Sequence, residues 1–314
     1  MKAKEHGKKA IRIVNNTVNF LVLIFIVLAV AFAGYALWDS KQISRAADKS
    51  NYEIYKPTAE DGRKSFEELQ AINPEVMAWL TIYGTNIDYP VTQGLDNMKY
   101  VNTNAEGRYS LSGSIFLDES NDKEFRDFNS ILYGHHMEKD AMFGGIGNFS
   151  DSDMFDSHRY GNLYFSGKDH GIEFFAFIHT DAYNRSVFKP NVKESDRKSY
   201  LDGLFGQAMH KRDIGVTTED HIVLLTTCSP SSTNGRDVLV GKISKETYEN
   251  LFADSKPGGK REQLHADSQN GLQGGIPRML IASALFIAIL LAVLILINKR
   301  RRKSNGENEE TKAV

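Results

Sequence analysis

Two long uncharged apolar runs constrain this chain more than any other feature of its sequence. Residues 20–38 and residues 279–297 each form an uninterrupted stretch of 19 residues without a charged side chain. A helix needs about 20 apolar residues to cross the hydrocarbon layer of a membrane, so both runs have the length of a transmembrane helix. We therefore expect two membrane spans, at 20–38 and 279–297, one near each end of the 314-residue chain.

Basic residues flank the outer ends of both runs. Residues 1–19 carry five Lys or Arg and one Glu, and residues 298–314 carry six Lys or Arg and three Glu. Because cytoplasmic flanks are enriched in Lys and Arg, both termini are predicted to be cytoplasmic tails of a two-pass plasma-membrane protein, with the central segment on the extracellular face. A cleaved signal peptide is the alternative for the first run, but that run is long for such a segment and lacks a clean small-residue cleavage site before Asp39.

The charge and cysteine content exclude several classes of protein. Residues 20–297 contain 27 basic and 36 acidic residues, a net charge of −9, which argues against a nucleic-acid partner. The single cysteine, Cys228, excludes an internal disulfide framework and a cysteine-rich zinc or iron–sulfur module. We predict neither a metal nor a cofactor.

Polar segments next to the two runs delimit one central domain. Residues 39–59 are predicted to be a juxtamembrane stem, and residues 253–278, rich in Gly, Gln and charge, a linker to the second span. Residues 60–252 between them are enough for one sizeable core. Short β-branched or aromatic runs bounded by turn residues predict eight strands, at 77–83, 87–93, 114–117, 130–133, 162–165, 172–179, 221–226 and 237–243.

Few helices accompany these strands. Helical patterns occur at 62–72, 141–149 and 196–209, and Ser195 is the expected N-cap of the last. Eight short strands with few long helices predict a mainly β fold, either a barrel or a sandwich.

The single cysteine is the strongest candidate for chemistry. Cys228 ends the apolar strand HIVLLTTC, Arg236 opens the next strand eight positions later, and His135 and His136 end another apolar strand, SILYGHH. A thiol with an ordinary pKa of about 8.5 needs such a cation or imidazole to become reactive. Taken singly, each residue is more simply structural, and the spacing of His135, His136 and Cys228 does not mark a zinc site. Their conjunction favours nucleophilic catalysis.

These residues resemble the class B sortases, membrane-anchored cysteine transpeptidases of Gram-positive bacteria. LLTTC at 224–228 matches the family's TLxTC signature, with Leu224 in place of the first Thr. The family's Gly-His pair falls on Gly134 and His135, and its Arg falls on Arg236 in GRDVLVGKI. The likeness covers about residues 60–252, because three further blocks also look like class B sequence: NPEVMAWLTIYGTNIDYPVTQGLDNMKYV, GSIFLDESN and NSILYGHHMEKDAMFGGIGNF.

The resemblance implies an eight-stranded sortase-type β-barrel and a two-step transpeptidation. Cys228 would attack the carbonyl of a Thr in the C-terminal sorting signal of a secreted protein, and an amine would then release the acyl group. His135 would protonate the leaving amine, with His136 as its rival, and Arg236 would stabilise the oxyanion. The positions that match the family's peptide groove are Asn97, Val101, Tyr133, Thr226 and Ser229.

The second apolar run departs from the usual class B pattern, in which the anchor is N-terminal only. A C-terminal span is familiar in class C sortases, but residues 39–60 contain no Asp-Pro-aromatic lid motif. The acceptor amine then belongs either to a peptidoglycan precursor, in cell-wall anchoring, or to a pilin Lys, in pilus assembly. Two competing hypotheses are a catalytically silent sortase-like scaffold and a plain thiol hydrolase, and the sequence leaves the sorting motif, NPxTx or LPxTG-like, open.

Overall fold

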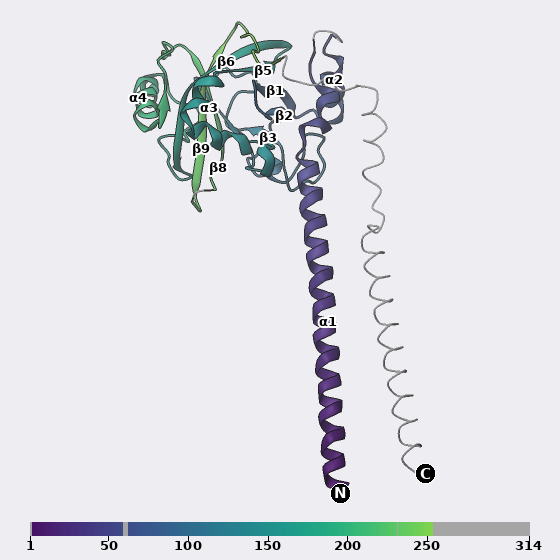
Figure 1. Ribbon diagram of the computed structural model, residues 1–314. Helices are drawn as coiled ribbons and strands as arrows, with labels where there is room; N and C mark the ends of the chain where they lie inside the picture. Colours follow the sequence, from purple (N-terminus) through teal and green to yellow (C-terminus); the bar gives the residue numbers. More distant parts are fainter. Residues whose placement is uncertain (1, 59–61, 231, 254–314) are drawn as a thin grey trace. The chain divides into compact units, whose positions relative to one another are not determined.

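The computed structural model describes residues 2–58, 62–230 and 232–253 (Figure 1). It divides into two units, one that contains the chain up to Lys41 and one that begins at Gln42, and each is described by itself. The predicted span at 279–297, the tail at 298–314 and all but the first residue of the linker lie outside the described residues.

The first apolar run forms the middle of one long helix. This helix, α1 (Lys2–Ala46), continues for 45 residues. Its part from Ala10 to Ala46 contains an 18-residue window with a mean hydropathy of 2.8, of which no residue is buried. Among the described residues it is the only helix long and apolar enough to cross a membrane. The exposed apolar surface is what a membrane anchor presents to lipid.

The strands of the second unit close into a barrel. Their order is β5-β1-β2-β3-β4-β8-β9-β6, and pairing of β5 with β6 closes the ring, while the two-residue β7 pairs with β6 outside it. The eight strands predicted from the sequence and the mainly β fold are therefore confirmed, with the barrel favoured over the sandwich. The strand bounds are β1 (Val76–Ile82), β2 (Asp88–Thr92), β3 (Ile115–Leu117), β4 (Asn129–Tyr133), β5 (Tyr160–Phe165), β6 (Lys168–Asp181), β7 (His210–Lys211), β8 (His221–Cys228) and β9 (Gly235–Ser244).

Side-chain alternation gives this barrel two cores. On β8, Val223 and Leu225 belong to the cluster that fills the interior, whereas Ile222 and Leu224 belong to a second cluster on the outer face. The helix α4 (Arg197–Gln207) covers the second cluster, with Tyr200, Leu201 and Leu204 packed into it (Figure 1). Because β8 is buried on both faces, its sequence is a continuous apolar run rather than an alternating one.

The outside of β1 is covered by α2 (Lys64–Ile72). Phe66 of α2 packs edge to face on Trp79 and Tyr164, with ring centroids 6.5 and 5.1 Å apart. The predicted helix at 62–72 is thus confirmed, although Ile72 at its end is exposed. Short 3₁₀ helices lie between these elements before residue 141: η1 (Lys49–Asn51), η2 (Glu53–Tyr55), η3 (Lys99–Val101) and η4 (Glu138–Asp140).

Two helical expectations need correction. The segment expected to be a helix at 141–149 is the 3₁₀ helix η5 (Gly144–Ser150), because the glycines of GGIG disfavour an α-helix, and the unexpected helix α3 (Ser152–Ser157) follows it. Ser195 is not the N-cap of α4. A 3₁₀ turn, η6 (Glu194–Asp196), precedes that helix, and the Ser195 hydroxyl donates to the Asp196 side chain at 3.0 Å instead.

Candidate active site

The register of β8 and β9 places Cys228 directly opposite Arg236. Cross-strand partners project to the same face of a sheet, and here it is the outer face, because Leu224 and Val238 in the same alternation lie in the outer cluster. The Cys228 thiol is exposed, whereas residues 222–227 before it are buried. The candidate nucleophile therefore lies at the exposed end of a strand whose preceding residues, 222–227, are buried.

The parallel pairing of β4 with β8 brings His135 to the same end of the barrel. Tyr133 is in register with Thr226, and the Gly134 amide donates to the Thr226 carbonyl at 3.1 Å. His135 follows Gly134 immediately, and Cys228 lies two residues beyond Thr226. Both side chains thus emerge where two adjacent strands end in the same direction.

The surroundings of the two histidines differ, and they favour His135 over His136. His135 is half-buried, and its Nε2 lies 2.8 Å from the Val101 carbonyl oxygen, whereas His136 is exposed. A carbonyl can only accept, so Nε2 carries a hydrogen and donates. This contact fixes the tautomer of the neutral ring and leaves Nδ1 as the nitrogen that can exchange a proton with a reacting group.

The glycine before His135 has a packing reason. A Cβ on Gly134 would lie 2.7 Å from two ring carbons of Phe143, a side chain that is fully buried. The Phe143 amide in turn donates to the His135 carbonyl at 3.0 Å. The absence of a side chain at Gly134 therefore allows the backbone that follows β4 to pack closely against the buried Phe143 ring.

Arg236 can supply a fixed positive charge at this end of the barrel. One of its guanidinium nitrogens, Nη1, donates to the Gly235 carbonyl at 3.0 Å, which holds the side chain at its own strand. The Arg236 charge also acts on Tyr133. Burial and the Asp118 carboxylate raise the pKa of the Tyr133 phenol, and the positive charge of Arg236 lowers it in part. A guanidinium at this position has the donors that an oxyanion requires.

The residues matched to the family's peptide groove fall into two groups. Asn97 and Tyr133 meet on one buried carboxylate, Asp118, while Val101 contributes the carbonyl that receives His135. Thr226 and Ser229 lie within two residues of Cys228 in the sequence and are both buried. The Thr226 hydroxyl has no hydrogen-bond partner among the described residues, and it lies on the face that carries Cys228.

Sequence reasoning missed Asp118, although it lies within the quoted block GSIFLDESN. Its two side-chain partners are 21 and 15 residues away in sequence, so no local spacing points to them. Among the described residues, no group of three or more His, Cys, Asp or Glu side chains is arranged to hold a metal.

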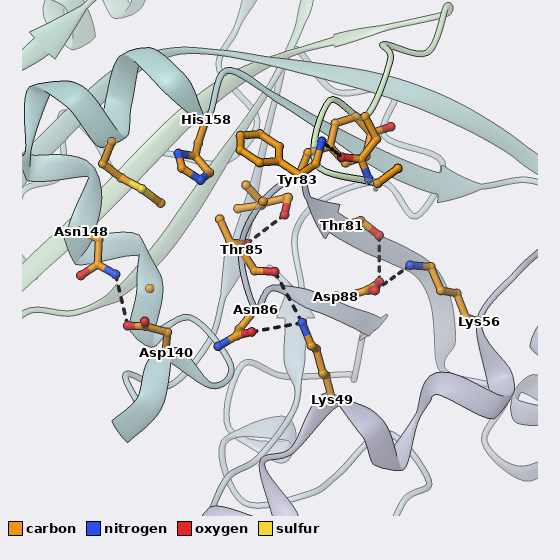
Figure 2. Close-up of a pocket in the computed structure, with 17 residues that line it drawn as sticks. Lys49, Lys56, Thr81, Tyr83, Thr85, Asn86, Asp88, Asp140, Asn148 and His158 are labelled. Atoms are coloured by element: carbon orange, nitrogen blue, oxygen red, sulfur yellow. Dashed lines mark hydrogen bonds and ion pairs between the residues drawn. The ribbon is translucent and has the colours of Figure 1, made fainter. Parts of the chain in front are cut away.

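A cleft of the second unit is separate from these residues. It has a volume of about 620 Å³ and is lined by the stem, the β1–β2 turn and residues 140–158 and 250–253. Figure 2 shows Lys56 paired with Asp88 at 2.6 Å and Lys49 directed at Asn86 at 3.2 Å. None of its lining residues is Cys228, His135 or Arg236, so this cleft is distinct from the candidate active site.

Comparisons with known proteins indicate one family. A family model described as a sortase domain matches residues 80–244, slightly more than half of the chain. Sortase B of Staphylococcus aureus is 31% identical over 240 residues, which cover 72% of this chain and 96% of that protein. Residues 80–244 lie within the domain expected at 60–252.

Solved structures extend this likeness to the fold. The crystal structure of sortase B from the type II pilus of Streptococcus pneumoniae is 44% identical, covers 58% of this chain and 99% of that one, and superposes with a TM-score of 0.52. A Streptococcus pyogenes class B sortase involved in pilus biogenesis is 39% identical, with 57% and 97% covered and a TM-score of 0.54. The chain therefore belongs to the sortase family of cysteine transpeptidases, and within that family to class B.

Proposed function

We propose that this protein is a membrane-anchored transpeptidase that cleaves a C-terminal sorting signal after Thr and transfers the acyl group to an amine of a peptidoglycan precursor. The observation that carries the proposal is the meeting of three strand ends: exposed Cys228 opposite Arg236, with His135 on the adjacent parallel strand. His135, Cys228 and Arg236 are the catalytic residues of this proposal.

The first step forms a thioester. The Cys228 sulfur, as thiolate, attacks the Thr carbonyl carbon, and the oxyanion of the tetrahedral intermediate is stabilised by Arg236. The carbon–nitrogen bond then breaks, and the leaving amine takes the proton from Nδ1 of the His135 imidazolium. Nε2 keeps its hydrogen bond to the Val101 carbonyl throughout, so the ring exchanges protons without losing its orientation.

The second step transfers the acyl group. The incoming amine attacks the thioester carbonyl, its proton passes to Nδ1 of neutral His135, and the carbon–sulfur bond breaks to return the thiolate. A new amide bond replaces the one cleaved, so the exchange needs no oxidant, reductant or metal.

The membrane helix supports the location of this reaction. We infer that α1 anchors the protein in the plasma membrane, with the basic segment 1–19 in the cytoplasm and the catalytic domain on the extracellular face. The two-pass arrangement, with a second span at 279–297 and a cytoplasmic tail at 298–314, is part of the proposal. An anchor on each side of the catalytic domain would hold it near membrane-linked precursors and raise their effective concentration.

Intact-mass spectrometry of the full-length protein in detergent micelles tests the proposal. Peptides with NPxTx or LPxTG signals are added with and without diaminopimelate-type or oligoglycine amines. We expect a Cys228 acyl adduct that the amine converts into a ligated peptide, absent in Cys228→Ala and His135→Ala and present in the matched control His136→Ala. A free acid in place of the ligated product would indicate a thiol hydrolase, and no adduct on a folded protein would favour a silent scaffold.

Pilus assembly is a second candidate, because the two solved class B relatives from Streptococcus are named for a pilus or for pilus biogenesis. In that case the acceptor amine is a Lys of a pilin subunit. The acceptor assay separates the two: with acylated Cys228, a folded pilin domain with a reactive Lys would be ligated in preference to diaminopimelate.

A further inference from the structure

We propose that Asp118 is a positioning residue that holds both walls of the peptide groove, and this inference rests on the proposed transpeptidase function. Asp118 follows β3 directly and is only 4% exposed. Its Oδ2 accepts a hydrogen bond from the Asn97 amide at 3.0 Å and another from the Tyr133 hydroxyl at 3.0 Å. One buried oxygen thus joins a loop residue to the end of β4.

The main chain of Asp118 makes it a rigid anchor. Its amide donates to the Ile131 carbonyl of β4 at 2.9 Å, and its own carbonyl accepts from the Gln93 side chain at 2.7 Å. The other carboxylate oxygen, Oδ1, accepts from the Ser120 amide at 2.9 Å. The carboxylate is therefore held independently of the two groove residues that it receives.

The hydrogen-bond pattern requires an acceptor at Oδ2. Asn97 cannot turn its amide around, because its oxygen already accepts from the Glu119 amide at 2.8 Å. Its nitrogen must therefore face Asp118, and an amide nitrogen can only donate. In Asp118→Asn, if the side-chain oxygen still accepts from the Ser120 amide, the new amide nitrogen faces the Asn97 amide nitrogen. Both are donors, and no acceptor lies between them.

The position of Tyr133 connects this anchor to the reaction. Tyr133 is in register with Thr226 on the strand that carries Cys228, and its ring also packs against Phe116 with centroids 5.3 Å apart. Because Phe116 fixes the Tyr133 ring and Asp118 fixes its hydroxyl, Tyr133 forms a rigid wall of the groove beside Thr226, two residues before Cys228. Loss of the Asp118 bond would free that wall and the Asn97 loop at the same time.

Peptide-side kinetics of the full-length protein test this role. We expect Asp118→Asn to raise KM for the sorting peptide about tenfold or more, since a hydrogen bond to a charged group is lost, and to leave KM for the amine unchanged. A variant whose only defect is a lower free energy of unfolding would contain less active protein, and both KM values would stay unchanged. The matched control is Asp88→Asn, because Asp88 is a half-buried carboxylate that also accepts several side-chain hydrogen bonds, from Lys56, Trp79 and Thr81, but lies on the separate cleft.

A double-mutant cycle with Tyr133→Phe gives a second, independent measure. Tyr133→Phe removes one donor without disturbing the buried carboxylate, so it serves even if Asp118→Asn does not fold. It should raise the peptide KM severalfold in the wild-type background and by a smaller factor beside Asp118→Asn, because residues in one hydrogen-bond network are not additive. Equal factors in both backgrounds, or an unchanged peptide KM in both single variants, would overturn the proposal.

Binding measurements separate this inference from the proposed function. A fluorescein-labelled NPxTx or LPxTG peptide is titrated into the Cys228→Ala protein with and without Asp118→Asn, and we expect about a tenfold weaker Kd with the second change. A wild-type protein that never acylates Cys228 would contradict the proposed function and this inference together. Normal acylation with unchanged peptide binding in Asp118→Asn would overturn only the role of Asp118.

Discussion

Replacement of Gly134 by Ala tests whether the packing before His135 sets the activity. The new Cβ would lie 2.7 Å from both Cγ and Cδ2 of Phe143, and carbon atoms in good contact lie about 3.5 Å apart. The two segments must therefore separate by roughly 0.8 Å. Neither side yields easily, because Gly134 is hydrogen-bonded to Thr226 and Phe143 is fully buried.

The expected effect is large on activity and moderate on stability. Overpacking of this kind costs about 1–3 kcal/mol of unfolding free energy, and a displacement near 1 Å of a catalytic group costs about a hundredfold in rate. Urea unfolding measures the first quantity, and the rate of Cys228 acylation by a sorting peptide measures the second. Phe143→Ala removes both clashing ring carbons and should restore part of the acylation rate, although the cavity that it leaves lowers the unfolding free energy further.

A glycine elsewhere provides the matched control. Gly203 lies inside α4, and a Cβ there would have no atom within 4 Å outside its own helix backbone and its chain neighbours. Gly203→Ala should therefore raise the unfolding free energy by about 0.5–1 kcal/mol and leave acylation unchanged. Wild-type acylation in Gly134→Ala, or failure of Phe143→Ala to improve acylation in the Gly134→Ala background, would refute the packing argument.

Three further outcomes follow from the site and the stem. Arg236→Lys should slow acylation of Cys228 about a hundredfold in a rapid-quench assay, and a wild-type rate would remove the guanidinium from the oxyanion site. Thr226→Val replaces a buried hydroxyl that has no partner within the described part of the chain, so urea unfolding should show equal or higher stability while peptide KM rises; an unchanged KM would place Thr226 outside the groove. Burial raises the pKa of Asp88, but the Lys56 charge and three hydrogen bonds hold that pKa below the ordinary value of an Asp. The stabilisation is therefore present at neutral pH and is lost as the pH falls through the folded pKa. Lys56→Met should therefore reduce the difference in unfolding free energy between pH 7 and pH 3.5, and an unreduced difference would contradict this pairing.

The strands were predictable because their patterns are local. The runs that became β8 and β9 have apolar centres, IVLL and VLV, as strands buried on both faces require, and turn residues separate them. The opposition of Cys228 and Arg236 also follows from short-range spacing, since a hairpin between them fixes the register. The helix predicted at 141–149 is wrong because the apolar residues of this segment recur with a helical period, whereas its glycines disfavour an α-helix and leave the 3₁₀ helix η5.

The supports of the site were not predictable in the same way. Asp118 is one Asp within a short block, and only the barrel brings Asn97 and Tyr133 to its carboxylate. The contact of His135 with the Val101 carbonyl spans 34 residues and involves a backbone atom, which no side-chain pattern records. Family motifs indicate which residues react, whereas such long-range contacts decide how those residues are held.

The two faces of β9 show how an exposed site is kept rigid. Arg236 projects to the outer face beside Cys228, while its neighbour Asp237 is buried on the opposite face and accepts a hydrogen bond from Nδ1 of His179 at 2.8 Å. Because successive side chains of a strand alternate, the polar pair on one face fixes the backbone from which the guanidinium on the other face extends. The same division holds on β8, where buried Thr227 precedes exposed Cys228. The His179–Asp237 pair thus supports the strand end from one face, while Cys228 stays exposed on the other.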